Sequence, residues 1–148
     1  MAYAEVTYSN LLKQAQEDVW RLLSESSTIR GYTTTILSNF PSSCLTKNLG
    51  WPFIVVPIPS MDEEQLTMGQ KRIFLLFNIE VWFKKLDSLV LVDAIRNLLS
   101  TNKGTFSGTY NLNQFLAGGG VSVIELPDGS SANQYVLSVE YEWIGDPS

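Results

Sequence analysis

Three glutamates are the strongest candidates for chemistry in the sequence. Glu80, Glu140 and Glu142 fall on the polar sides of two long alternating segments, and neighbouring strands would gather them on one surface. General acid–base catalysis needs two such groups whose surroundings push their pKa values apart. An open sheet face offers no pocket that would desolvate a carboxylate, so we interpret the three residues as a solvated acidic face.

Other groups that do chemistry are scarce. The chain has no histidine, which removes the commonest general base, the usual zinc ligands and the familiar nucleophile triads. The single cysteine, Cys44, lies in a Ser-rich stretch and is expected to be an inert, at least half-buried thiol. The run Asp62-Glu63-Glu64 supplies too few convergent ligands for a metal ion and is expected at a solvated tip. We therefore expect no catalytic residue, no metal site and no cofactor, and we do not expect an enzyme.

Charge and length narrow the class of protein further. The 148 residues fit one domain, 1–148, and their net charge is −5 with only ten lysines and arginines. A chain this acidic cannot neutralise many phosphates, which argues against tight nucleic-acid binding. Its apolar runs are short for a membrane span and its first residues do not resemble a signal peptide, so we expect a soluble protein kept in the cytoplasm.

Two long strands are expected to position the glutamates. Residues 72–84 and 134–143 each alternate apolar with polar side chains, a pattern typical of a sheet with one buried face. The apolar rows consist of Ile73, Leu75, Phe77, Ile79, Val81 and Phe83 in the first strand, and of Tyr135, Leu137, Val139, Tyr141 and Trp143 in the second.

Helices and further strands are expected around these two. A helix capped by Thr7 or Ser9 runs to about residue 24, and a second, capped by Asp87 or Ser88, covers residues 88–100. Shorter strands are predicted at residues 32–37, 53–58 and 121–126. The predicted fold is α+β, with an antiparallel or mixed sheet of two hairpins, helices packed on one face and the order α-β-β-α-β-β.

Two long loops carry the candidate interface residues. Residues 60–70 read as an extended hairpin loop, and residues 105–120 read as a glycine-flanked loop that docks on a partner or folds back on the protein. Trp82, between Glu80 and Lys84 on the polar side of its strand, is expected to be an exposed aromatic that meets another subunit. The interface residues predicted in the loops are Met61, Asp62, Glu63, Glu64, Leu66 and Met68 in the first, and Phe106, Tyr110 and Phe115 in the second.

The order of these elements resembles the tail terminator or tail completion proteins of long-tailed bacteriophages and related viruses, which join head to tail. The resemblance covers nearly the whole chain, from the N-terminal helix through the long-tipped hairpin of residues 53–84 to the last hairpin. It implies a ring, typically a hexamer, that caps the tail tube, stops its polymerisation and offers a surface for the head.

Partners and location follow from the same resemblance. They would be other copies of the chain, the tail-tube protein and neck or connector proteins, within a virion assembled in the host cytoplasm. The two loops would supply the two patches of a head-to-tail ring. The face of Glu80, Glu140 and Glu142 would line a lumen through which DNA passes without specific binding.

Two other interpretations stay open. One is a neck or head-completion connector, or a tail-tube subunit. The other belongs to a different class: a small ferredoxin-like domain that binds an apolar ligand between sheet and helices, with Phe77, Trp82, Tyr141 and Trp143 as its lining. An enzyme ranks third, because no nucleophile with a neighbouring base can be assembled.

Overall fold

A computed structural model describes residues 7–38, 51–101, 110–116, 120–126 and 129–145. The helices are α1 (Leu11–Glu25), α2 (Ser27–Arg30) and α3 (Leu89–Thr101), with 3-10 turns at Tyr8–Asn10 and Leu86–Ser88. The strands are β1 (Ile36–Leu37), β2 (Phe53–Val55), β3 (Ser60–Thr67), β4 (Gln70–Phe83), β5 (Tyr110–Phe115), β6 (Val121–Glu125) and β7 (Ser131–Gly145).

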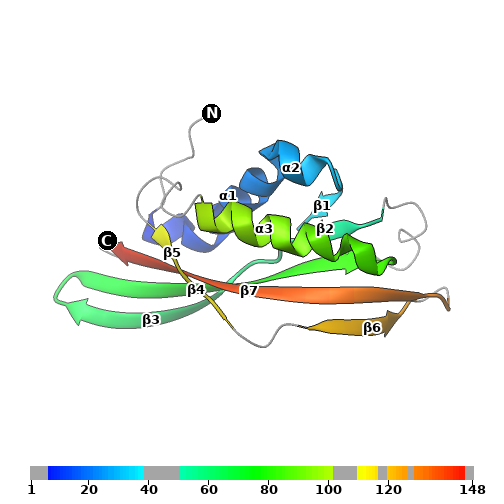
Figure 1. Cartoon of the computed structure of the whole chain (residues 1–148). Helices are drawn as coiled ribbons and strands as arrows, with labels where there is room; N and C mark the ends of the chain where they lie inside the picture. Colours follow the sequence, from blue (N-terminus) through cyan, green and yellow to red (C-terminus); the bar gives the residue numbers. More distant parts are fainter. Residues whose placement is uncertain (1–6, 39–50, 102–109, 117–119, 127–128, 146–148) are drawn as a thin grey trace.

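One seven-stranded mixed sheet carries all the helices on a single face (Figure 1). Its central path is β1-β2-β4-β7-β5, while β3 shares the outer edge of β4 with β2, and β6 shares that of β7 with β5. The predicted α+β class with helices on one face is confirmed. None of the described helices is long and apolar enough to cross a membrane.

The pair β4–β7 is the spine of the sheet. The two strands run antiparallel over thirteen residue pairs, from Lys71 opposite Gly145 to Phe83 opposite Asn133. Because side chains alternate across a strand, the odd-numbered rows of both strands point to the same face and meet α1 and α3 there. The ring of Tyr141 meets that of Phe77 edge-on at 5.8 Å, and both residues are fully buried.

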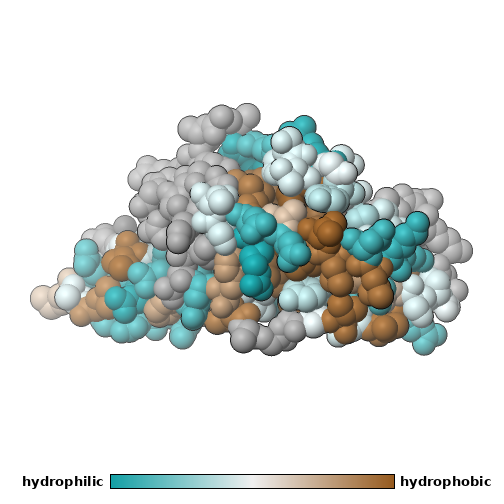
Figure 2. Space-filling model, viewed as in Figure 1, coloured by the Kyte–Doolittle hydropathy of each residue, from teal (hydrophilic) through white to brown (hydrophobic). Residues whose placement is uncertain are grey.

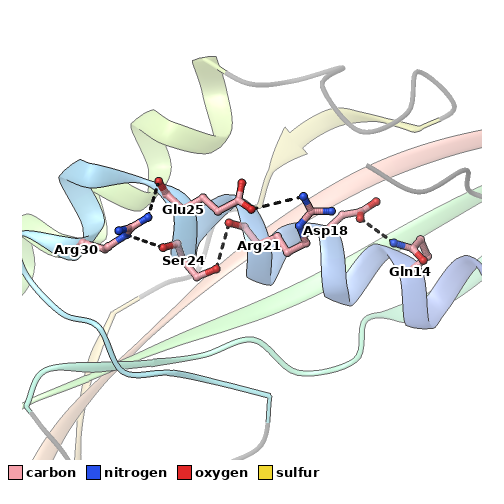
Figure 3. Close-up of polar contacts among 6 residues, drawn as sticks. All are labelled: Gln14, Asp18, Arg21, Ser24, Glu25 and Arg30. Carbon is pink, nitrogen blue, oxygen red and sulfur yellow. Dashed lines mark hydrogen bonds and ion pairs between the residues drawn. The ribbon is translucent and has the colours of Figure 1, made fainter. Parts of the chain in front are cut away.

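Polar contacts fix the end of α1 against α2 (Figure 3). The Arg30 guanidinium donates to the carbonyl oxygens of Ser24 at 2.9 Å and Glu25 at 3.4 Å. These carbonyls belong to the last turn of α1, where no intrahelical donor exists for them. One turn earlier, Arg21 pairs with Glu25 at 3.5 Å. The helix layer is therefore braced at the point where the chain turns toward β1.

Two of the predicted loops are strands, and the loop predictions are wrong there. Ser60–Thr67 forms β3, paired with the first half of β4, so that only Met68 and Gly69 make the turn. Gly69 adopts φ +87°, a conformation that favours glycine. Within the second predicted loop, residues 110–115 form β5 along β7. Residues 102–109 and 117–119 lie outside the described residues.

Edge strands are shorter than the sequence indicates. The predicted strand at residues 32–37 is reduced to β1, which pairs in parallel with β2. The strand predicted at residues 53–58 stops at Val55, just before prolines that cannot donate ladder hydrogen bonds.

A second, smaller core lies on the sheet face opposite the helices. Phe53, Val55 and Trp82 form it together with Leu126 and Ala132, and each of these side chains is at most 5% exposed. The rings of Phe53 and Trp82 stack at 6.1 Å with an interplanar angle of 7°. The two faces of the sheet are therefore both apolar at the β2 and β6 end, while the face without helices mixes polar and apolar side chains along the rest of β4 and β7.

Candidate functional site

The β3–β4 hairpin carries the first group of predicted interface residues and extends past the helical layer (Figure 1). Met68 at its turn is 99% exposed and Met61 is 42% exposed, so two apolar side chains face solvent on this projection. Leu66 is half-buried and sits at an irregularity of the register between Gln65 and Thr67. The residues lie on a paired strand rather than on a free loop, which fixes their directions.

A small polar cluster ties this hairpin to the start of the helical layer. The Tyr8 hydroxyl donates to Glu63 at 2.6 Å, and the Lys71 ammonium pairs with the same carboxylate at 3.1 Å. The hydrogen bond from Tyr8, followed by that from Lys71, lowers the pKa of Glu63. Conversely, the bond to Glu63 raises the pKa of Tyr8 and of Lys71. Glu63 is thus a structural anion of the hairpin and not a proton donor near neutral pH.

A row of charged side chains lies on the opposite face of the same strands. Arg72 lies 3.8 Å from the carboxylate of Glu64 on β3 and 3.5 Å from that of Glu142 on β7. The Arg72 guanidinium of β4 therefore links β3 and β7, the strands on either side of β4. These contacts lie on the sheet face without helices, which we call the open face. Asp62, in the same alternating row of β3 as Glu64, adds a further carboxylate to this surface.

The three predicted glutamates share the open face but do not form one cluster. On β7, Glu140 lies opposite Leu76 and Glu142 lies opposite Phe74. Glu80 of β4 lies opposite Val136, which is four positions along β7 from Glu140. At a rise of about 3.3 Å per residue this is about 13 Å. Glu80 accepts hydrogen bonds from Trp82 Nε1 at 2.9 Å and from Gln134 at 3.0 Å. Glu80 is therefore a carboxylate held by two neighbouring side chains, at a distance from Glu140 and Glu142.

The expectation of an exposed Trp82 is wrong. Its side chain is 5% exposed, because Phe53 of β2 and Leu126 after β6 enclose it in the second core. Within its own strand Trp82 has polar neighbours, Glu80 and Lys84, which is why the alternation pointed to solvent.

The structure describes only part of the second group of predicted interface residues. Phe106 lies outside the described residues, and Tyr110 is the first residue of β5, in register with Trp143. Phe115 is half-buried against the main core, with the Arg96 guanidinium 5.1 Å from its ring centroid. The loop predicted around Phe115 is instead a strand, β5, which pairs with β7 and places Phe115 against the main core. Its role at an interface stays a prediction.

The lining predicted for an apolar ligand site is not a lining. Phe77, Tyr141 and Trp143 are packed in the main core, and Trp82 lies on the other face of the sheet. Two cavities among the described residues are open surface grooves. One of about 390 Å³ runs between α2 and α3, and one of about 450 Å³ lies beside Trp20 and β1. Among the described residues no group of three His, Cys, Asp or Glu side chains is placed to hold a metal ion.

An apolar surface that sequence reasoning missed lies at the other end of the sheet from the hairpin. Val121 and Val123 of β6 are 41% and 71% exposed, and Leu86 and Val90 at the start of α3 are 65% and 48% exposed. Figure 2 shows hydrophobic surface there, where α3 lies above β6 and β7. We call Val121 and Val123 the β6 patch. Val90 instead lines grooves between α3 and the α2 segment that includes Tyr32. The sequence predicted a strand at residues 121–126, and the alternation of Val121 and Val123 in it was the available signal.

Comparison with known proteins adds one finding about the fold. No family model matches the chain, and no curated protein matches it. Among solved structures, a chain of the structure described as "Virion of native gene transfer agent (GTA) particle" superposes with a TM-score of 0.57. The match covers 86% of this chain and 93% of that chain, at 14% sequence identity. The chain therefore shares its α+β fold, over almost the full length of both, with a chain of that particle.

Proposed function

We propose that this chain is a structural, non-enzymatic protein of a virus-like particle. The observation that carries the proposal is the shared fold with a chain of a gene transfer agent virion, which extends over most of both chains. The distribution of surface groups agrees with it, because large apolar side chains such as Met68 and Val123 are exposed and carboxylates are spread along strands.

The specific role that we propose is that of a ring of six copies at the end of a tail tube. There it would stop tube polymerisation and present a surface to neck or connector proteins. A ring built by rotation needs two different surfaces on each copy, one meeting the other on the next copy. The β3–β4 hairpin with Met61 and Met68 is one such surface, and the β6 patch of Val121 and Val123 is the other.

The open face is the side that we assign to the lumen of this ring. Its row of Glu80, Glu140 and Glu142 gives a negative surface along the long axis of β4 and β7. DNA would be repelled from such a wall and would slide past it rather than bind. Arg72 offsets part of this charge beside Glu142, so the repulsion comes mainly from Glu80 and Glu140.

The ring is tested by native mass spectrometry with negative-stain images of the same sample across a range of concentrations. The proposal expects a single closed oligomer with a central hole. A monomer at every concentration up to the solubility limit contradicts the ring. As a matched comparison, the doubly neutralised variant Glu80→Gln with Glu140→Gln should still form the ring but retain more DNA on it at low salt, since only the lumen charge is removed.

A further inference from the structure

A small groove with two lysines lies at the end of β4 that is remote from the hairpin turn. Its volume is about 170 Å³, and its lining consists of Trp51, Pro52, Lys84, Lys85 and Ser88. We call it the basic groove. The Lys84 ammonium lies 5.0 Å from the centroid of the Trp51 ring. Both lysines are exposed, and neither forms an ion pair with a carboxylate of the described residues. Their charges are therefore available to a negatively charged partner.

The β3–β4 hairpin carries carboxylates that suit this groove. Asp62 is exposed and has no ion-pair or hydrogen-bond partner among the described residues. The Glu64 side chain is 55% exposed and lies 3.8 Å from Arg72, which is long for an ion pair. The same guanidinium also faces Glu142 at 3.5 Å, so one cation is shared by two carboxylates. This part of the open face therefore keeps an excess of negative charge.

The hairpin and the basic groove lie on the same edge of β4 but at its opposite ends (Figure 1). Asp62 of β3 pairs with Phe74, which precedes Lys84 by ten residues, a separation of about 33 Å along the strand. Both side chains point to the open face: Asp62 shares the face of Phe74, and Lys84 lies over Trp51, which packs against the second core. The opposite charges therefore share a face and an edge but cannot meet within one copy.

We propose that the basic groove of one copy binds the β3 carboxylates of the next copy, with Lys84 beside Asp62 and Glu64. This rests on the proposed ring and names a charged contact within it. Because the two groups lie at opposite ends of one chain, the contact repeats head to tail. They meet side by side only when neighbouring open faces look the same way, as they do around one lumen.

The β6 patch lies at the same end of the sheet as the basic groove, since Phe83 and Val123 both pair with Asn133. That end of each copy therefore offers an apolar and a basic surface to the hairpin of its neighbour. The charged contact gives the association its direction, because a hairpin that approached another hairpin would bring carboxylates together.

The first test is a charge swap, followed by sedimentation and native mass spectrometry at low salt. Lys84→Glu and Asp62→Lys should each weaken the association of copies at least about tenfold, because each brings like charges together. The double variant restores opposite charges and should recover most of the lost affinity. Glu17→Lys, which reverses an exposed carboxylate of α1, is the matched control and should assemble as the wild type does. Circular dichroism should show the wild-type fold in all four variants.

Two outcomes of the charge swap overturn the inference. One is a ring of unchanged affinity in both folded single variants. The other is a double variant that assembles no better than the weaker of the two single variants, because the two side chains then act independently of each other.

The second test is a disulfide between copies. In a Cys44→Ser background, which removes the single cysteine, Asp62→Cys and Lys84→Cys are introduced together. A disulfide requires Cα atoms within about 7 Å, so this pair can be bridged only between copies. Oxidation should give covalent ladders up to the full ring, and Glu17→Cys with Lys84→Cys as the control pair should give none. An intact ring without cross-links overturns the contact but leaves the proposed function standing. A wild-type chain that never forms a ring contradicts the proposed function and the inference with it.

Discussion

Removal of the Trp82 side chain distinguishes a core residue from an interface residue. In the structure the indole is 5% exposed, stacks on Phe53 and donates to Glu80 at 2.9 Å. Truncating a buried tryptophan to alanine costs about 3–5 kcal/mol, which is a large part of a typical stability of about 5–15 kcal/mol. Loss of the Nε1 hydrogen bond contributes about 0.5–1.5 kcal/mol of this, and Glu80 keeps its bond from Gln134.

Urea denaturation of the monomer measures this cost. With a slope of about 2 kcal/mol per M for a domain of this size, Trp82→Ala should lower the midpoint by about 1.5–2.5 M. Far-UV circular dichroism is the probe, because the substitution itself changes the fluorescence. Trp20→Ala is the control: its indole is 39% exposed and holds one bond, to the Ile36 carbonyl at 2.9 Å, so its cost should be only about 1–2 kcal/mol. An unchanged midpoint for Trp82→Ala, together with weaker self-association, would refute the second core.

Three further substitutions test local features. Glu63→Gln should lower the melting temperature at pH 7, because Tyr8 and Lys71 stabilise the charged form of Glu63. The difference from the wild type should vanish as the pH falls from about 4.3, the pKa of an unfolded glutamate, through the lowered folded-state pKa of Glu63. A difference that is constant with pH would contradict this. Gly69→Ala should destabilise by about 1–2 kcal/mol in chemical denaturation, because φ is +87° there and alanine is strained at that angle. Gly145→Ala should destabilise by about 1–3 kcal/mol in the same assay, since a Cβ would lie 2.4 Å from the Trp143 ring, and an unaffected variant would show that the ring moves aside freely.

The central part of the fold was predictable from periodicity alone. Strict alternation in β4 and β7 identified both strands, and the buried rows follow it residue by residue from Ile73 to Phe83. The stripe of Val92, Ile95 and Leu99 identified α3 in the same way. These elements bury one face against a common core, so a local pattern records their environment.

β3 was missed because its residues have low strand propensity. Aspartate and glutamate are depleted in strands, and the run Asp62-Glu63-Glu64 looks like a solvated loop. What stabilises it as a strand is the opposite charge across the hairpin, where Lys71 and Arg72 face Glu63 and Glu64. The available signal was the pair of acidic residues before the Met68-Gly69 turn and the pair of basic residues after it.

The candidate site was less predictable than the fold. Burial of Trp82 depends on Phe53 and Leu126, which are remote in sequence and approach it only when the sheet forms. The exposure of Val123 likewise depends on whether another part of the chain covers β6, and the residue pattern of one strand does not show this. The acidic face was found because its residues alternate with the core rows of the same two strands.

The place of β7 in the sheet has a consequence for synthesis. β7 is the last strand in sequence order and yet lies in the middle of the sheet, between β4 and the edge strands β5 and β6. Roughly 50 residues separate the end of β4 from the start of β7, and a ribosome adds about 5–20 residues per second. For about 3–10 s the apolar row of β4 has been translated while the strand that completes its ladder has not. During that interval the nascent chain exposes the unpaired apolar edge of β4, which later lies in the middle of the core. The order of the strands in the sequence, rather than the stability of the folded protein, therefore determines how long this edge is open to aggregation and to chaperones.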